Sequence, residues 1–546
     1  MKKYLFYRSF SILIVVIFTF SSITSVQAQN SDFFTKGFTV QEKNNLKQHF
    51  LDNSMHIANT LIKNAIQDNK SGLKWDKYFN LTDNSTSKFY FGYYYGAAGI
   101  GDYFSNLYNQ TLNKTYLTFA IKAYDYINAH AITNGSFYDG FFNVPGFVFW
   151  TRSEDSSIPY IGVKYGNPGI NTFLFNLYFN TQNVTYLNLA EKSLRTLMYV
   201  ANEGSILNPS RNGIYWNYSL VDQDTITDIV YGNAGIVSSF LDGYKITKNE
   251  TYLNIATNAI KFIISESGIT DNTTNGQRFV RFSPSPFYPF TFTGYLTGAS
   301  GIGSVLLDYY QITNNNDYLL FARQIGNWLA ANEKNGLWKT GGADLLTEQP
   351  NEDGSFTGYG AGSAGIGIFL LDLYHITKDT KYLQTIKDIN DMFTNLASVS
   401  GDSVSIPIQK VDSQQEVIQS NLKMGLAGIG LYFSSLYHYF GLNESLNTLS
   451  GLVNYLDSKM DSNGIIPTIV GLNNSDNTNF DLSLLEGLTG IGYFYLQSFK
   501  SLNSTPIFDS ASYYKGVSKN KSSLPGFEFF PTIIILVLLI KRKKLN

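Results

Sequence analysis

The pentapeptide Gly96-Ala97-Ala98-Gly99-Ile100 is the first of seven copies of a Gly-x-x-Gly-Ile motif in this chain of 546 residues. The glycine pairs are Gly96/Gly99, Gly166/Gly169, Gly232/Gly235, Gly298/Gly301, Gly362/Gly365, Gly425/Gly428 and Gly487/Gly490. Successive copies are 70, 66, 66, 64, 63 and 62 residues apart. An aromatic residue also lies nine positions after every second glycine, from Tyr108 to Phe499. Such a regular period indicates a repeat architecture, and this decides the fold class.

Each repeat predicts a pair of helices. The motif begins an apolar helix of about four turns, and after a short polar connector a second helix follows, which has one apolar face, as in Tyr186-Leu187, Ala190 and Leu194. The segment Gln41–Ile66 supplies one more amphipathic helix before the first motif. A helix that is apolar on all sides must be buried. We therefore expect an all-α, (α/α)7 toroid over residues 41–502, with seven inner and seven outer helices.

The connections between helices are unequal in length. Inner-to-outer connectors are short, whereas outer-to-inner loops such as Ser71–Tyr95 run to roughly 25–34 residues, and several carry an Asn-Gly turn beside a short apolar strand. All the long loops emerge on the face where the inner helices begin, which we call the mouth. A rigid scaffold that carries long loops on one face usually binds its ligand there.

The N-terminal segment predicts export. Residues 1–28 combine a basic start at Lys2 and Lys3 with the apolar stretch Ile12–Phe20 and a small-residue cleavage site before Gln29. This order is typical of a secretory signal.

The C-terminal segment predicts attachment to a membrane. Residues 503–524 are rich in Ser, Lys and Asn and should form a flexible stalk. Residues 525–546 place Pro525-Gly526-Phe527 before an apolar run and a basic end. This tail resembles the sorting signal of archaeal surface proteins, which implies a sortase-type processing enzyme. We expect an extracellular protein at the cell surface, anchored to the membrane by this tail.

Composition narrows the class of partner. The formal net charge is −2 and the chain has no internal basic block, so nothing indicates nucleic-acid binding. There are no cysteines, so the exported domain must be stabilised by its core alone. We expect a monomer.

The seven motifs, the strand-bearing loops and the two-ring layout resemble the lanthionine synthetase C-like family over residues 41–501. The resemblance implies peptide binding or peptide modification, in which a Zn²⁺ at the mouth activates a thiolate for addition to a dehydroamino acid. The family's ligands are a Cys in a Trp-Cys-x-Gly motif of repeat five and a Cys-His pair before the glycine of repeat six. Here the first position is Gly360, and the pair is Lys423 and Met424. A family histidine of a middle repeat corresponds to Thr297.

None of the histidines in the sequence is placed to substitute for these zinc ligands. The five histidines are His49, His56, His130, His375 and His438. His375 and His438 fall near the far ends of their inner helices, and we expect all five to be exposed and none to lie near the mouth. The sequence thus predicts no catalytic zinc and no cofactor.

Several side chains are expected at the mouth, either because they precede a first glycine by one to four residues or because they lie in the mouth-side loops. As candidate catalytic groups we take Glu486, Lys423 and Asp228, and we expect both carboxylates to stay ionised among the converging helix N-termini. The candidate ligand-binding residues are Tyr95, Lys164, Tyr165, Tyr231, Trp216, Trp338 and Asp344. The cations favour anionic or carbonyl oxygens, and we expect either a Lys423–Glu486 interaction or a bound anion at the metal position. The structural alternative is that the tyrosines line a packed funnel and the tryptophans pack against strands.

Two functions remain open at this stage. One is a zinc-independent protein that binds or modifies extracellular peptides, for which a mouth lined by Lys164, Lys423, tyrosines and one glutamate would be evidence. The other is a carbohydrate-active enzyme or lectin that binds a glycan through loop carboxylates, for which two opposed carboxylates about 5–9 Å apart would be evidence.

Overall fold

The computed structural model describes residues 33–80, 88–133, 146–203, 213–220, 224–266, 268–272, 277–281, 292–338, 355–410, 417–470, 479–508 and 513. The predicted secretory signal (1–28) and sorting tail (525–546) lie outside these residues. No helix in the described part of the chain is long and apolar enough to cross a membrane.

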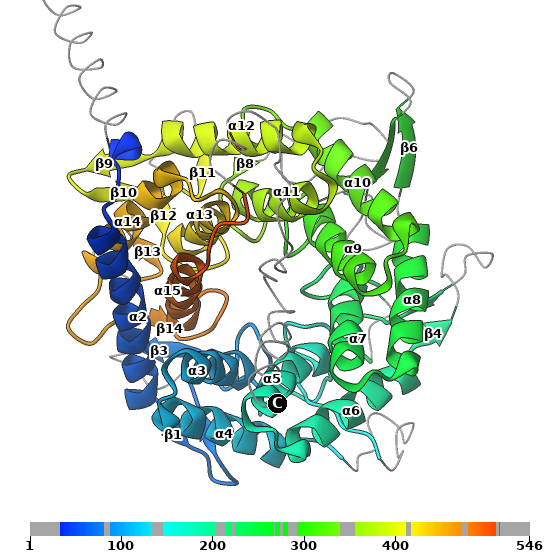
Figure 1. The fold of residues 1–546 in the computed structure, drawn as a ribbon. Coiled ribbons are helices and arrows are strands. Elements are labelled where there is room, and N and C mark those ends of the chain that lie inside the picture. The colour runs from blue at the N-terminus through cyan, green and yellow to red at the C-terminus, as the bar shows by residue number, and fades with distance from the viewer. Residues whose placement is uncertain are drawn as a thin grey trace, which may run out of the picture.

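The described helices form two concentric rings, as the repeats predict (Figure 1). The inner ring consists of α3 (Ala97–Thr111), α5 (Asn167–Thr181), α7 (Asn233–Thr247), α9 (Ala299–Thr313), α11 (Ser363–Thr377), α13 (Leu426–Phe440) and α15 (Leu488–Asn503). The outer ring consists of α2 (Val40–Lys63), α4 (Lys114–Ala129), α6 (Val184–Tyr199), α8 (Glu250–Ser265), α10 (Asn316–Ala331), α12 (Thr380–Leu396) and α14 (Asn443–Asp457). The inner helices are buried along most of their length, and this confirms the all-α toroid.

The short connectors follow from local backbone chemistry. The inner helix α3 ends at Leu112, whose φ of 57° is left-handed, and the next residue, Asn113, caps α4 by accepting the N–H of Thr115. Five of the inner-to-outer junctions repeat this pattern of a left-handed residue and an Asn or Asp cap. Two residues are thus enough to reverse the chain.

The second glycine of each motif allows neighbouring repeats to approach. A Cβ on Gly99 would lie 1.9 Å from the carbonyl oxygen of Tyr93 and 3.1 Å from Leu484 Cβ. Because Leu484 belongs to the seventh repeat and Gly99 to the first, this contact closes the ring. In the same place the first outer helix, α2, packs against the last inner helix, α15, and completes the seventh helix pair.

The long loops carry short antiparallel strands in two arrangements. Four pairs are local: β1 (Ile66–Gln67) with β2 (Leu73–Lys74), β4 (Asn202–Glu203) with β5 (Ile214–Tyr215), β6 (Gly268–Asn272) with β7 (Gln277–Arg281), and β9 (Ser398–Ser400) with β10 (Ser403–Ser405). Three pairs join the loops of neighbouring repeats: β8 (Ser355–Phe356) with β11 (Gln409–Lys410), β12 (Ile418–Gln419) with β13 (Ile469–Val470), and β3 (Tyr78–Asn80) with β14 (Asn479–Asp481). The last pair sets Asp481 opposite Tyr78 and links the first repeat to the seventh.

The loop tryptophans are part of the core. Four indole N–H groups each donate to a carbonyl in the last turns of an outer helix: Trp75 to Leu61, Trp150 to Ile127, Trp216 to Leu197 and Trp338 to Leu329, at 2.7–2.8 Å. Trp216 and Trp338 are only 1% and 2% exposed. Their rings are therefore closed to a ligand, which corrects the expectation that they bind one; packing of the loops explains their positions.

The face opposite the mouth holds the end of the described chain. Beyond α15, the N–H of Phe508 donates to the carbonyl of Tyr439 at 2.7 Å, and its ring packs 5.3 Å from Phe440. The chain thus stays on the toroid past residue 503, where a free stalk was expected. His438, in the same region, is buried and bonds to Ser504 Oγ at 2.7 Å, so the expectation that every histidine is exposed is wrong.

Candidate functional site

Backbone hydrogen bonds join neighbouring repeats around the mouth. The residues two positions before each first glycine form what we call the mouth belt: Tyr94, Lys164, Val230, Leu296, Gly360, Lys423 and Leu485. The N–H of Leu485 donates to the carbonyl of Tyr94, and Lys423 donates to Leu485, at 3.1 and 3.0 Å. The bonds continue from Gly360 to Lys423, Leu296 to Gly360, Val230 to Leu296 and Lys164 to Val230. This belt fixes where the side chains of Lys164 and Lys423 begin.

Glu486 is the centre of an ionic cluster at the belt. Its Oε1 lies 3.0 Å from Lys423 Nζ and accepts the hydroxyl of Tyr95 at 2.6 Å, and its Oε2 lies 3.3 Å from Lys77 Nζ. Lys77 also pairs with Asp481 at 3.1 Å, and both of these side chains are buried. The Lys423–Glu486 interaction predicted from the sequence is confirmed, whereas Lys77 was missed because it lies in a long loop outside the repeat motif.

The two candidate carboxylates differ in ionisation. Burial tends to raise the pKa of Glu486, but the hydrogen bond from Tyr95 and the ammonium of Lys423 bring it down to about 2. For Asp228, burial raises the pKa to about 7, although the N–H of Tyr231 donates to its Oδ1 at 2.7 Å. Glu486 is therefore ionised as expected, and the expectation of a fully ionised Asp228 is corrected. Asp228 is 1% exposed, and its visible role is to hold the turn before α7.

Lys164 lies among the three tyrosines that precede a first glycine. Its ammonium donates to the hydroxyl of Tyr231 at 2.6 Å. It also lies 4.5, 5.0 and 4.6 Å from the ring centroids of Tyr95, Tyr165 and Tyr231. Burial, followed by repulsion from Lys423, lowers the pKa of Lys164 to about 8. The four side chains thus form a partly closed cage, and its cation is easier to deprotonate than an ordinary lysine.

Aromatic side chains continue from this cage into the long loops of the first two repeats. The ring of Tyr165 stacks on Tyr90 at 6.0 Å and contacts Tyr160 at 5.6 Å. The guanidinium of Arg152 lies 5.8–6.0 Å from the rings of Tyr90, Tyr160 and Tyr165. Sequence reasoning missed Arg152, Tyr90 and Tyr160, since they lie in long loops and follow no fixed spacing from the glycines.

The amino-acid sequence matches the family model described as lanthionine synthetase C-like protein over residues 30–218 and 214–352. The chain belongs to the lanthionine synthetase C-like family. No curated protein matches it.

Solved structures that resemble this family member share little sequence with it. Nisin cyclase is 16% identical, with a TM-score of 0.47, and the match covers 75% of this chain and 88% of that one. A family 76 α-mannanase of Bacteroides thetaiotaomicron is 17% identical, with a TM-score of 0.41 and coverage of 61% and 84%. Cellobiose 2-epimerase from Bacillus thermoamylovorans is 13% identical, with a TM-score of 0.43 and coverage of 66% and 92%.

The residues at the positions that the sequence resemblance assigns to the family's zinc ligands do not fit a zinc ion. A Cβ built on Gly360 would lie 3.1 Å from Lys423 Cγ, so these two positions adjoin, as ligands of one metal must. However, Gly360 offers no side chain and the Lys423 ammonium repels a cation. The remaining position, Met424, gives only a thioether, a weak ligand for zinc. The Lys423–Glu486 pair thus lies at the positions that the resemblance assigns to the family's metal ligands.

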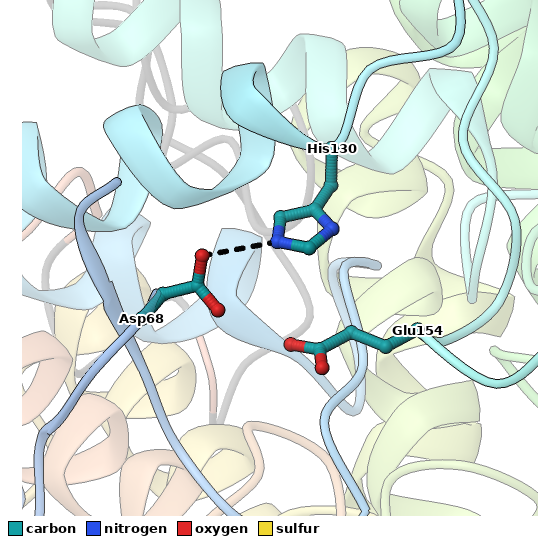
Figure 2. A group of neighbouring side chains, drawn as sticks. All are labelled: Asp68, His130 and Glu154. Carbon is teal, nitrogen blue, oxygen red and sulfur yellow. Dashed lines mark hydrogen bonds and ion pairs between the residues drawn. The ribbon is translucent and has the colours of Figure 1, made fainter. Parts of the chain in front are cut away.

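A second cluster of possible metal ligands lies toward the edge of the mouth face. Figure 2 shows Asp68, His130 and Glu154, whose ligand atoms lie within 4.8 Å of one another. Lys74 Nζ lies 3.1 Å from Asp68 Oδ1 and 2.8 Å from Glu154 Oε1. The ammonium of Lys74 therefore already supplies the cation that the two carboxylates require, and the group ties the β1–β2 hairpin to the end of α4. His130 also corrects the expectation that no histidine lies on the mouth face.

Of the site residues predicted from the sequence, the structure brings together Glu486, Lys423, Tyr95, Lys164, Tyr165 and Tyr231. Asp228 is buried beside Tyr231, and Trp216 and Trp338 are in the core. Asp344 lies outside the described residues, as do the loop carboxylates Asp222, Glu348, Glu352 and Asp353.

Proposed function

We propose that this lanthionine synthetase C-like protein binds or modifies extracellular peptides at its mouth and does so without zinc. The observation that carries the proposal is the Lys423–Glu486 pair at the family's metal position. The resemblance implies that members of the family bind or modify peptides at the mouth of the toroid. This chain retains the toroid and its mouth, but a fixed ion pair lies there. The side chains here supply no ligands for a metal ion that would activate a thiolate. The activity that these residues support is therefore binding through charge and aromatic contact.

The lining of the mouth favours a peptide over a glycan. Lys164, Lys423, three tyrosines and one glutamate lie together there, as a peptide-handling mouth would require. A glycosidase needs one carboxylic acid and one free carboxylate on opposite sides of its substrate. Here Asp481 and Glu486 both bind Lys77, and the pKa of Glu486 is about 2. Glu486 is thus a poor proton donor and is already bound to cations, so this pair does not suit glycoside hydrolysis.

The place where the protein works is part of the proposal. The signal-like residues 1–28 and the tail 525–546 support export and attachment to the outer face of the membrane. In that setting the mouth would meet secreted or surface peptides, and a sortase-type enzyme would be the partner that processes the tail.

The proposal is tested with the purified exported domain, residues 30–514. Binding is measured by calorimetry to synthetic hexapeptides with acidic, basic or apolar side chains, and to α-1,6-mannotriose as the glycan control. We expect micromolar to millimolar binding of at least one peptide class, unchanged by a chelator, and no binding of the trisaccharide. Binding of mannotriose alone would refute the peptide proposal. Chelator-sensitive addition of glutathione to a dehydroalanine peptide would refute zinc independence.

A further inference from the structure

The charges at the mouth belt do not cancel among the described residues. Lys77 pairs with Asp481, and Lys423 pairs with Glu486. Lys164 is a third ammonium group, and no described carboxylate lies within ion-pair distance of it. Its polar contact is the Tyr231 hydroxyl. Glu486 and, more weakly, Asp228 are close enough to favour the charged form of Lys164. Glu486 already binds Lys423 and Lys77, however, and the raised pKa of Asp228 prevents it from supplying a full negative charge. A partly buried cation without a full partner is costly, so the belt favours an added anion.

The groups around Lys164 offer hydrogen-bond donors to such an anion. The oxygen of Tyr231 accepts a hydrogen bond from Lys164, so the hydroxyl hydrogen of Tyr231 is directed elsewhere and is able to donate. Lys164 keeps two further N–H donors. The Lys423 side chain is 41% exposed and adds positive charge nearby. The tyrosine rings exclude water from one side of the cage, which strengthens a charge-assisted hydrogen bond.

We propose that Lys164 and Tyr231 bind a carboxylate of the ligand, with Lys423 adding to its attraction. This inference rests on the proposed function and narrows the ligand class to peptides that present a carboxylate, either at the C-terminus or on an acidic side chain. The surplus at the belt is about one positive charge, so a carboxylate, which carries one negative charge, neutralises it. A phosphate dianion would leave a surplus negative charge beside Glu486.

The same geometry predicts how ligand binding depends on pH. The groups that face Lys164 are Lys77, Lys423, Glu486, Asp228, Tyr95, Tyr165 and Tyr231. The pKa of Lys164 is lowered to about 8, so its charged form is lost as pH rises through that value. Carboxylate affinity should therefore fall above about pH 8, and binding near pH 8 should take up protons, because the bound anion restores the ammonium.

The test measures how fast Lys164 reacts with an acetylating reagent at pH 8, with modification at each lysine followed by mass spectrometry. Matched ligands are compared: acetyl-Ala-Phe with its free carboxylate, the same dipeptide as an amide, acetyl-Glu-Phe amide, and benzoate against benzamide. We expect each carboxylate to slow acetylation of Lys164 at least about threefold at concentrations above Kd, and the two carboxylate-free compounds to leave it unchanged. Lys261, exposed on α8, is the internal control in every sample.

The outcomes separate this inference from the proposed function. Equal protection by the dipeptide acid and its amide would overturn the carboxylate site and leave peptide binding standing. Protection by benzoate without protection by any peptide would support the anion site and refute the peptide function. No protection by any compound would overturn the carboxylate site, and the calorimetry with hexapeptides would then decide the peptide function separately.

Two variants show whether protection comes from the proposed contacts. Tyr231→Phe removes one donor, and Lys423→Met removes one nearby charge, so each should reduce protection several-fold while Lys261→Met leaves it unchanged. Each variant is first shown to melt cooperatively, so that loss of protection is not loss of the fold. Full protection in both mouth variants would contradict the assignment of these residues.

Discussion

Lys423 Nζ lies 3.0 Å from Glu486 Oε1 across the junction between the sixth and the seventh repeats. The backbone bond from Lys423 N–H to the carbonyl of Leu485 holds the two residues at this junction, so their separation is set by the ring itself. The pair connects the belt to Lys77 and Tyr95, and it lies at a position that the sequence resemblance assigns to the family's metal ligands. Both the stability and the chemistry of the mouth should therefore depend on it.

Replacing Glu486 with Gln should destabilise the protein by about 1–3 kcal/mol. The variant keeps the shape of the side chain but leaves Lys423 without a carboxylate and Lys77 with Asp481 alone. Urea unfolding of both proteins at pH 7 measures the difference, and Glu250→Gln on an exposed helix start is the control. The effect should also depend on pH. Because the pKa of Glu486 is lowered to about 2, its stabilisation is complete above about pH 5 and is lost as pH falls toward 2, so the two proteins should converge. A gap that stays constant over this range would contradict the role given to the charge.

The Gly235→Val variant should lose at least about 1–3 kcal/mol of unfolding free energy. A Cβ at this position would lie 2.1 Å from the carbonyl oxygen of Ile229 and 2.5 Å from Val163 Cγ2, so the turn or the neighbouring repeat must shift. Gly37→Val is the matched control, since nothing lies within 4 Å of its Cβ position. Thermal melts that shift equally for the two variants would show that the second glycine is not needed for repeat packing.

The C-terminal boundary of the toroid is tested with two versions of the domain that end at different residues. We expect residues 30–505 to fold but to melt well below residues 30–514, because the shorter version loses Phe508 and uncovers Phe440 and Tyr374. Loss of a buried Phe side chain costs about 3–5 kcal/mol. Phe508→Ala in the longer version should reproduce most of the shift. Identical melting temperatures would place the end of the domain before residue 506.

The fold was predictable because equivalent glycines make the same close contacts in every repeat. The spacing of the glycines in the sequence therefore reflects the spacing of the packed helices. The Lys423–Glu486 pair was predictable for the same reason, since both residues have fixed positions relative to a first glycine. Lys77 and Arg152 reach the mouth through long loops, whose paths follow no period. The tryptophans lie in the mouth loops as expected, but their indole N–H groups bond to outer-helix carbonyls, and sequence position does not reveal this.

Restoring the family's ligands should create a metal site. The triple variant Gly360→Cys, Lys423→Cys and Met424→His removes the cation and supplies three zinc ligands at adjoining positions. We expect the variant to retain about one zinc per chain after dialysis, and a triple alanine variant at the same positions to retain none. Failure of a folded triple variant to hold zinc would show that these positions do not correspond to the family's site.

The account is tested most directly by the zinc content of residues 30–514 with the natural sequence, purified in the presence of zinc, dialysed and measured by elemental analysis. Because a fixed ion pair stands at the family's metal position, we expect far less than one zinc per chain. Stoichiometric zinc, retained in the wild-type protein and reduced by Glu486→Gln, would place a metal at this site and contradict the account.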